Sequence, residues 1–298
     1  MSFRFRILLP LLLATLPLAA PASTPINETR PLNADGKVEI SNVKGRIEVR
    51  VWDKPEVHIG GSLGRGVDSF DIRGDRNELE IIVRYPRNTN DRNSEPTNLV
   101  IDVPTLASLE IEGVAVEISV VGTAGRSLQI DSVSGDITVA GAPRKADIES
   151  VSGDLKLTLN SGDVEAQSVS GSITLRGRLD GEVDAEAVSG NITVDNRGER
   201  LRRLSTTTVS GNANLQVGLA DGGSVKAESV SGDIKVVTPK SLSARVNAES
   251  FSGHLRAPGA TIDKPQFGPG SSFEHRYGAG NGEIHMETFS GSAELLLQ

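Results

Sequence analysis

Apolar residues alternate with polar residues over most of the chain, in short segments that come in pairs. In residues 225–236 two such segments follow each other, and they are out of phase because Ser229 and Val230 are adjacent and both belong to an inward set. Alternation with a period of two is typical of β-strands that have one buried face and one exposed face. The break in phase therefore predicts two strands joined at a corner. The expected inward residues are Val225, Ala227, Ser229, Val230, Gly232, Ile234 and Val236.

The predicted corner carries a recurring tripeptide, Val-Ser-Gly, which becomes Phe-Ser-Gly near the C-terminus. Successive copies begin 18, 18, 19, 21, 21, 21 and 38 residues apart. A period of about 20 residues is typical of proteins in which each repeat buries its apolar face against the next. We therefore predict an all-β fold, a parallel β-helix (a single-stranded β-solenoid) with coils of about 18–21 residues. The copies begin at Val133, Val151, Val169, Val188, Val209, Val230, Phe251 and Phe289.

The N-terminal segment has the pattern of an export signal. Two arginines near the start precede an apolar stretch, residues 7–20, and Ala20-Pro21-Ala22 supplies the small residues of a cleavage site. A membrane anchor is the alternative, but the stretch is short and broken by two prolines. We expect export to remove residues 1–22 and to deliver the protein to the periplasm, the cell surface or the medium.

The rest of the chain divides into an irregular part and a regular part. Residues 23–125 fit the repeat pattern less closely, and we predict that they begin the same stack and cap it; a separate small β-domain is the alternative. Residues 126–298 are predicted to form the regular solenoid, with a Gly/Pro-rich loop insertion at about 258–282. The last coil, which ends near Leu297, is expected to close the stack.

Composition and charge remove several classes of function. The predicted signal holds two of the 31 basic residues and none of the 39 acidic ones, which leaves 29 basic against 39 acidic residues and a formal charge of −10. This balance argues against nucleic acid and anionic lipid as partners. Cysteine is absent, which excludes disulfides and a lipid-anchored lipoprotein. No segment after the signal is long and apolar enough to span a bilayer, and we expect a monomer.

The repeats carry a resemblance to a known family. Val133-Ser134-Gly135-Asp136-Ile137 and its copies, with Gly36-Lys37-Val38-Glu39-Ile40 and Trp52-Asp53 near the front, resemble a bacterial family of "putative adhesins" of unknown function. The resemblance covers nearly the whole predicted mature chain. It implies a three-sided or flattened parallel β-helix and a role in the cell envelope, and it brings no catalytic residues to transfer.

Two features that carry chemistry in other proteins lack their context in this chain. Gly60-Gly61-Ser62-Leu63-Gly64 matches the nucleophile-elbow pattern, but residues 65–68 lack the helical periodicity that an elbow requires, and we interpret the motif as a glycine-rich turn. The histidines share no metal-ligand spacing, so we expect solvated side chains. The prediction is that the chain has no catalytic residue, no metal ligand and no cofactor. The histidines are His58, His254, His275 and His285.

Acidic residues recur at the outward position just before the predicted corner. In a parallel stack they would form a column along one face, where like charges raise carboxylate pKa values or recruit cations. We expect residues from successive repeats to lie next to each other in this column, as for Glu228 and Glu249. The candidate interaction face is Asp131, Glu149, Glu186, Glu228 and Glu249, and the candidate loop contacts are Phe267, Phe273 and Tyr277.

These features favour a non-catalytic scaffold or adhesin-like binding module of the cell envelope, whose partner is an envelope protein or a glycan. A polysaccharide-active β-helix enzyme, a lyase or a glycosidase, is the first alternative. Such an enzyme needs two carboxylates about 5 to 10 Å apart in a walled cleft. A periplasmic accessory of envelope-stress signalling is the second alternative, and it rests on the resemblance alone.

Overall fold

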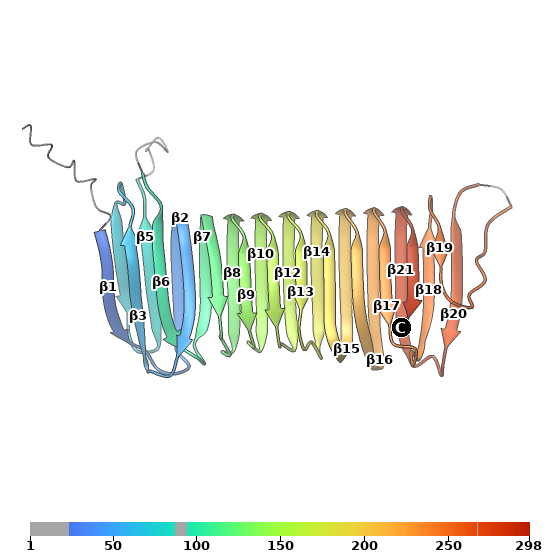
Figure 1. The fold of residues 1–298 in the computed structure, drawn as a ribbon, viewed down its shortest axis with the longest axis horizontal. Coiled ribbons are helices and arrows are strands. Elements are labelled where there is room, and N and C mark those ends of the chain that lie inside the picture. Colours follow the sequence, from blue (N-terminus) through green and yellow to red (C-terminus); the bar gives the residue numbers. More distant parts are fainter. Residues whose placement is uncertain (1–23, 87–93, 267) are drawn as a thin grey trace, which may run out of the picture.

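A computed structural model describes residues 24–86, 94–266 and 268–298. The predicted export signal lies outside these residues. The described chain is all-β, and its strands belong to one large, mostly parallel sheet that runs along the length of the molecule (Figure 1). Within the described residues, no helix has the length and apolarity needed to cross a membrane. The predicted all-β class and the parallel pairing of the repeats are confirmed.

The middle of the molecule is a regular stack of paired strands. We call each pair a rung; its two strands lie in two separate rows, and each strand runs parallel to the equivalent strand of the next rung. The strands here are β8 (Ser127–Ser134), β9 (Ile137–Gly141), β10 (Lys145–Ser152), β11 (Leu155–Leu159), β12 (Asp163–Ser170), β13 (Ile173–Arg176), β14 (Glu182–Ser189) and β15 (Ile192–Ser210).

The core is a column of small and aliphatic side chains enclosed between the two rows. Ala146 and Ile148 face inward from β10, and Leu155 and Leu157 face inward from β11; none is more than 1% exposed. Fully burying a large aliphatic side chain stabilises a fold by about 1.5–3 kcal/mol. A single rung would leave its inward apolar side chains exposed to water above and below. Each rung is therefore stabilised by the rungs stacked on either side of it, as the alternation predicts.

The corner differs from the predicted geometry in one respect. Val151 was expected to face inward, but its side chain is 49% exposed, whereas Ser150 before it is 4% exposed. The strand alternation therefore continues through the valine, and the change of phase occurs at the Ser-Gly step. Glycine is required there because a Cβ on Gly190 would lie 2.0 Å from the carbonyl oxygen of Gly171 in the preceding rung.

A ladder of side-chain hydrogen bonds runs through the polar residue that follows each corner glycine. The backbone N–H of Asp154 donates to Oδ1 of Asp136 (3.0 Å), and the N–H of Ser172 donates to Oδ1 of Asp154 (2.9 Å). The ladder continues at Asn212, whose N–H donates to Oδ1 of Asn191 (2.9 Å). These bonds satisfy backbone donors where the chain leaves one row for the other.

The N-terminal end departs from chain order. The long strand β2 passes through both rows and forms the first complete rung by itself. It pairs with β7 on one side, and on the other side its first half pairs with β5 and its second half with β6. Antiparallel strands then extend the two rows, with β4 beside β5, β3 beside β6 and β1 beside β3. The strands here are β1 (Thr24–Pro31), β2 (Lys37–Trp52), β3 (Glu56–Leu63), β4 (Ser69–Gly74), β5 (Glu78–Arg84), β6 (Thr97–Pro104) and β7 (Ser108–Val121).

The C-terminal end departs from chain order as well. β21 pairs with β16 on one side and β18 on the other, and β22 pairs with β17 and β19. The last rung is therefore inserted between two earlier ones. The strands here are β16 (Ala213–Ser231), β17 (Ile234–Thr238), β18 (Ala244–Ser250), β19 (Leu255–Arg256), β20 (Ser271–Tyr277), β21 (Gly282–Ser290) and β22 (Ala293–Leu297).

The prediction that the last coil closes the stack is wrong. Beyond the inserted rung lie β18, β19 and the antiparallel strand β20, which pairs with β18 and belongs to the stretch expected to be a loop. The corner ladder follows the same spatial order. The N–H of Ser292 donates to Oδ1 of Asp233 (2.8 Å), and the N–H of His254 donates to Oγ of Ser292 (3.4 Å).

Candidate binding surface

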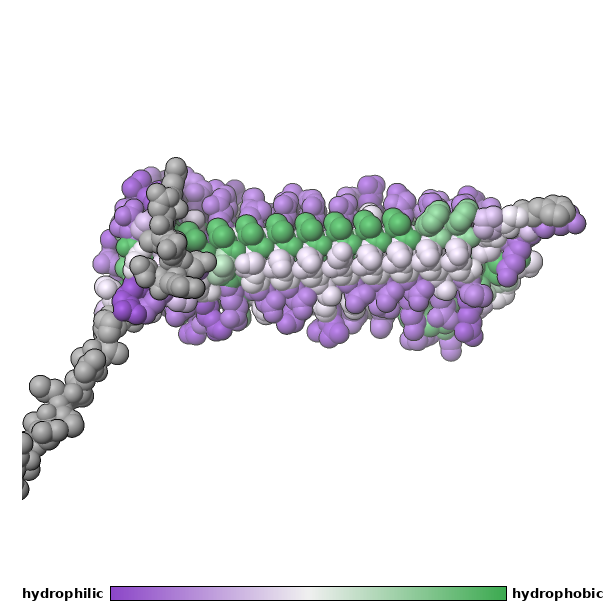
Figure 2. Space-filling model, turned by 90° about the horizontal axis from the view of Figure 1, so that it is seen from above, coloured by the Kyte–Doolittle hydropathy of each residue, from purple (hydrophilic) through white to green (hydrophobic). Residues whose placement is uncertain are grey.

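The outward-facing residues of the corner motifs form a continuous apolar row along one edge of the stack. Figure 2 shows this row as a green band that follows the long axis. Its members are between 45% and 57% exposed, although each is a large hydrophobic residue. We call this row the apolar ridge. In spatial order it comprises Val114, Val133, Val151, Val169, Val188, Val209, Val230, Phe289 and Phe251.

The aromatic end of the ridge depends on the inserted rung. Phe289 and Phe251 are 38 residues apart in the chain, but their rings stack with centroids 4.7 Å apart and planes inclined by 6°. Their stacking covers part of each ring, and each still keeps about half of its surface exposed. The ridge therefore ends in a flat aromatic platform beside Val230.

An acidic column runs parallel to the ridge, two residues earlier on each strand. Asp131 and Glu149 face each other in register on β8 and β10, so the prediction that they are neighbours is confirmed. Glu186 lies further along the same column on β14. Two residues before the column lies a second outward column, which includes Asp147 and Glu165. The carboxylates of both columns therefore gather on one face of the stack.

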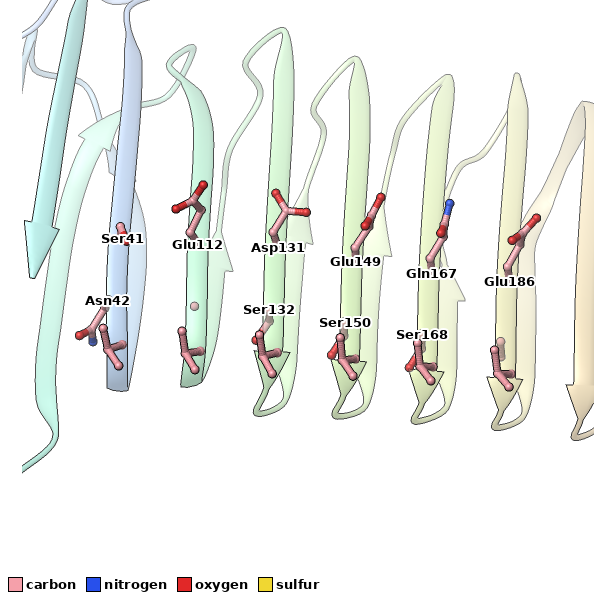
Figure 3. A pocket seen from close by; sticks show the side chains of 18 of the residues that line it. Ser41, Asn42, Glu112, Asp131, Ser132, Glu149, Ser150, Gln167, Ser168 and Glu186 are labelled. Atoms are coloured by element: carbon pink, nitrogen blue, oxygen red, sulfur yellow. The ribbon is translucent and has the colours of Figure 1, made fainter. Parts of the chain in front are cut away.

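A furrow of about 600 Å³ lies between the acidic column and the apolar ridge. Its floor is the strand backbone at the small residue that separates the two rows on each strand, such as Ser150 or Ser168. Figure 3 shows the carboxylates of Glu112, Asp131 and Glu149 on one side of these small residues. The furrow crosses several successive strands, from β2 to β15, and has one acidic wall and one apolar wall.

Three carboxyl groups in the middle of the stack have raised pKa values. Partial burial, and then the neighbouring charges of Asp131, Asp147 and Glu165, raise the pKa of Glu149. The pKa of Asp147 is raised by burial and then mainly by Glu165. Asp184 also has a raised pKa, through burial and the charge of Glu165. The predicted repulsion therefore contributes to the raised pKa values in this region, although desolvation contributes more.

The acidic residues near the N-terminus are compensated instead. The ammonium group of Lys37 bonds to Glu39 on its own strand and to Glu110 on β7, 2.6 Å away. These hydrogen bonds, first of all the one that Lys37 donates to Glu110, raise the pKa of Lys37 and keep it charged. The like-charged columns of the middle region therefore give way to mixed charges at this end.

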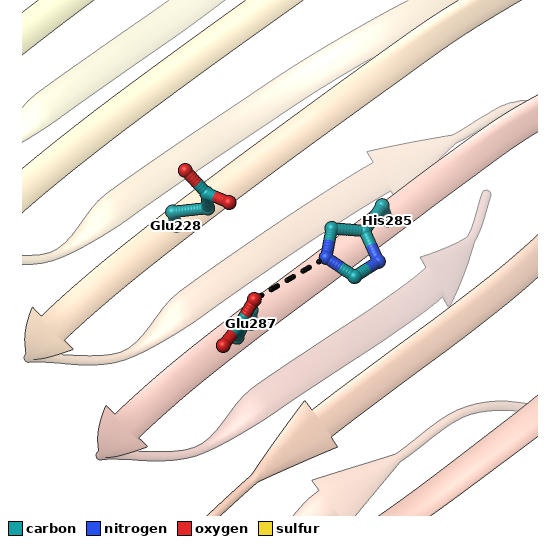
Figure 4. A group of neighbouring side chains, drawn as sticks. All are labelled: Glu228, His285 and Glu287. Atoms are coloured by element: carbon teal, nitrogen blue, oxygen red, sulfur yellow. Dashed lines mark ion pairs between the residues drawn. The ribbon is translucent and has the colours of Figure 1, made fainter.

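The C-terminal part of the acidic column differs from the prediction. Glu228 and Glu249 were expected to be neighbours, but Glu287 of the inserted rung lies between them, in register with both. Glu287 and Glu228 also approach His285, and one ligand atom from each of the three lies within 4.8 Å of the others (Figure 4). The repeat pattern alone does not reveal this group, because its members come from strands that only the insertion makes adjacent.

Two of the three predicted loop contacts, Phe273 and Tyr277, lie within the described residues. Phe273 belongs to β20 and is only 3% exposed, so the expectation that it is available for contact is wrong. Tyr277 is half-buried, and its hydroxyl donates to the carbonyl oxygen of Pro258 at 2.6 Å. Phe267 lies outside the described residues. The alternating pattern around Phe273 was the available signal, because it places this side chain on an inward face.

The glycine-rich motif near residue 62 does not have the form of a nucleophile elbow. Ser62 lies within strand β3, in register with Pro25 on β1 and Asn98 on β6, so the interpretation of the motif as a glycine-rich turn is wrong. A nucleophile elbow places its serine on a sharp turn between a strand and a helix. We find no acyl-transfer geometry at this serine.

Solved structures share this fold. A "putative adhesin" from Parabacteroides distasonis matches with a TM-score of 0.52 and 15% sequence identity, over 92% of this chain and 98% of that chain. A "putative adhesin" from Parabacteroides merdae matches with a TM-score of 0.52 and 12% identity, over 92% and 96% of the two chains. Similarity at this level of identity shows the fold alone.

Sequence comparisons give one clear result. A search of curated proteins finds no match. The family model described as Toastrack DUF4097 matches residues 32–223, which is more than half of the chain and includes β2 to β15. Neither this family nor the two structures carries an enzyme name. The chain belongs to the Toastrack DUF4097 family.

Proposed function

We propose that this protein is a non-catalytic binding module of the bacterial cell envelope, built as a β-solenoid that holds a partner along its furrow. The observation that carries the proposal is the apolar ridge beside the acidic column. Solvent-exposed apolar rows of this length are unusual on monomeric proteins and mark interaction sites. The chemistry of the furrow selects an elongated protein segment with apolar residues flanked by Lys or Arg.

Charge supports a cationic partner. The carboxylates of Glu149, Asp147 and Asp184 have raised pKa values, so their charged forms are poorly stabilised in the free protein. A lysine or arginine placed beside them would relieve both the desolvation and the mutual repulsion. The net charge of the predicted mature chain, −10, would steer a basic partner toward the surface.

The composition of the furrow supports a protein segment over a glycan. Sugars are usually held by stacked aromatic side chains together with polar groups, and the furrow is lined by Val, Ser, Gly, Asn, Gln, Ala, Thr, Asp and Glu. Trp52 lies elsewhere, where its indole N–H donates to the carbonyl oxygen of Glu56 at 2.8 Å. Repeated valines present a flat aliphatic wall that suits Leu, Ile or Val side chains.

The envelope location rests on the N-terminal pattern of charge, apolar stretch and Ala20-Pro21-Ala22. Family membership is consistent with this location. No observation favours the enzyme alternative, because the carboxylates that line the furrow all belong to its acidic wall, and the wall opposite is apolar. Glycoside cleavage requires two carboxyl groups that flank the scissile bond.

A model peptide tests the proposal directly. A fluorescent peptide of Leu and Lys in an amphipathic pattern should bind the mature chain, residues 23–298, in an anisotropy titration, and a Leu/Glu peptide should not. Combining Val151→Thr, Val169→Thr and Val188→Thr keeps shape and β-branching but removes three apolar contacts. We expect this variant to bind roughly tenfold more weakly.

The matched control is Val121→Thr, which changes a valine that is 48% exposed but does not line the furrow. It should bind like the unaltered protein. Equal binding of the acidic and basic peptides, or unchanged affinity of the triple variant, would count against the proposed surface.

A further inference from the structure

We infer that Glu228, His285 and Glu287 form a site for a divalent transition-metal ion such as Zn²⁺. The carboxylates belong to adjacent positions of the acidic column on β16 and β21. His285 lies two residues before Glu287, so both side chains project from the same face of β21. The three ligand atoms lie within 4.8 Å of one another (Figure 4), a spacing that one ion could bridge with small side-chain rotations.

The histidine is oriented as a ligand by a residue of the next strand. Nδ1 of His285 lies 2.8 Å from the amide oxygen of Asn247 on β18. An amide oxygen can only accept a hydrogen bond, so Nδ1 carries a proton and donates it. In the neutral ring this leaves the lone pair on Nε2, which lies 3.5 Å from Oε2 of Glu287. Metal-binding histidines are typically held in this way, through a hydrogen bond from the other ring nitrogen.

The ligand set indicates the class of ion. One imidazole nitrogen and two carboxylates suit Zn²⁺ and other first-row divalent ions, whereas Ca²⁺ and Mg²⁺ prefer oxygen ligands alone. Three protein ligands leave at least one position for water. His285 and Glu228 are partly buried, and Glu287 is exposed, so an ion could reach the site from solvent.

Lys226 competes with the ion. Its ammonium group lies 2.8 Å from Oε1 of Glu228. Lys226 is also in register with His285 on the neighbouring strand. An ion at the site must therefore displace the ammonium group from Glu228 or share the carboxylate with it. Removing the lysine charge should tighten metal binding.

An ion bound at this site would stabilise the position of the inserted rung. Glu228 belongs to β16, whereas His285 and Glu287 belong to β21, which lies between β16 and β18 although it follows both of them in the chain. A metal bridge between β16 and β21 would stabilise this junction without a disulfide. This role is independent of the proposed furrow, because the furrow extends only from β2 to β15.

The experiment titrates tag-free mature protein with ZnCl₂ in a calorimeter and measures melting temperatures with and without the ion. We expect saturable binding of one ion and a raised melting temperature, following the linkage between binding and folding. His285→Gln should weaken binding at least about tenfold. Lys226→Gln should tighten it several-fold, and unchanged or weaker binding would contradict the competition described above.

Two matched controls separate this site from other surface groups. Glu249→Gln removes the next carboxylate of the column, and His254→Gln removes an exposed histidine; both should bind Zn²⁺ as the unaltered protein does. All substitutions lie on the surface, and equal melting temperatures in EDTA would verify folding. Absence of saturable binding, full binding by His285→Gln, or an equal rise in melting temperature with Ca²⁺ would overturn the inference.

Discussion

The middle of the stack and its C-terminal end are built from the same repeat but assembled differently. In the middle, β8, β10, β12 and β14 follow one another both along the chain and across the sheet. At the C-terminal end the chain forms β16, passes to β18, and returns with β21 to the position between them.

The difference shows how little of the order of the rungs is encoded in the rungs themselves. Each has the same inward pattern and the same corner, so each can pack on either neighbour. The connection between β17 and β18 consists of residues 239–243. It is long enough to reach across the position of one additional rung, which lengthens the distance to be spanned by about 4.8 Å. Connections between strands, and closure of the end by β20, therefore decide the order.

Engineered disulfides give the sharpest test of this comparison. The chain has no cysteine, and a disulfide requires Cα atoms about 4.4–6.8 Å apart. Glu228→Cys with Glu287→Cys should oxidise to a crosslink, because the two residues are in register on adjacent strands. Glu228→Cys with Glu249→Cys should not, because two strand spacings amount to about 9.6 Å.

The middle region supplies the matched controls for the crosslinks. Asp131→Cys with Glu149→Cys should form a crosslink, and Asp131→Cys with Gln167→Cys should not. Intact mass after mild oxidation and alkylation measures each outcome. Efficient crosslinking of positions 228 and 249 would mean that the last rung is not inserted.

Inward substitutions should have the next largest effect. Ile192 is fully buried, so Ile192→Asp places an uncompensated carboxylate in the core and should cost several kcal/mol of unfolding free energy. Thr193→Asp, one residue later and facing outward, should cost under about 1 kcal/mol. At the outermost rung, Leu255 is 9% exposed, and Leu255→Asp should cost less than Ile192→Asp. Chemical denaturation measures all three, and equal losses would contradict the inward and outward assignment.

The corner glycines should show a smaller but clear effect. A Cβ on Gly190 would lie 2.0 Å from a carbonyl oxygen of the preceding rung, so Gly190→Ala must separate two rungs and should cost roughly 1–3 kcal/mol. Ser189→Ala, at an exposed neighbouring position, should change stability by less than about 0.5 kcal/mol. A stability loss for Gly190→Ala no larger than that for Ser189→Ala would show that the corner can relax.

The acidic column should give the smallest effect and a pH dependence. The pKa of Glu149 is raised in the folded protein, so folding disfavours its charged form. The contribution of Glu149 to the free energy of unfolding therefore decreases as the pH rises from its pKa in the unfolded chain, near 4.3, to its higher pKa in the folded protein. Above the folded pKa the contribution stays at this lower value. Glu149→Gln should raise the melting temperature at pH 7, by an amount equivalent to under about 0.5 kcal/mol, and the gain should shrink toward pH 4.

Glu228 provides the contrast at the C-terminal end. It is paired with Lys226 at 2.8 Å, so Glu228→Gln should not stabilise the protein at pH 7. Melting curves from pH 4 to pH 8 compare the two variants. A stabilisation of the same size from Glu228→Gln would mean that compensation by Lys226 is ineffective.

Local patterns along the chain determined much of this structure. Alternation identified inward residues such as Ile192 and outward ones such as Thr193, because backbone pleating fixes a period of two. It also placed the acidic residues in a column, with Asp131 beside Glu149, because successive repeats pair in register and so stack equivalent residues. The tripeptides also located the corners. They did not indicate that Val151 faces outward.

Long-range packing decided the rest. The phase at the corner depends on the approach of Gly190 to the preceding rung, which no single repeat reveals. The insertion of β21, the stacking of Phe251 on Phe289 and the proximity of Glu228 to His285 depend on which rung becomes whose neighbour. Since the rungs share one inward pattern, burial alone does not distinguish their orders, and the choice rests on how the connections span the stack and how its open end is covered.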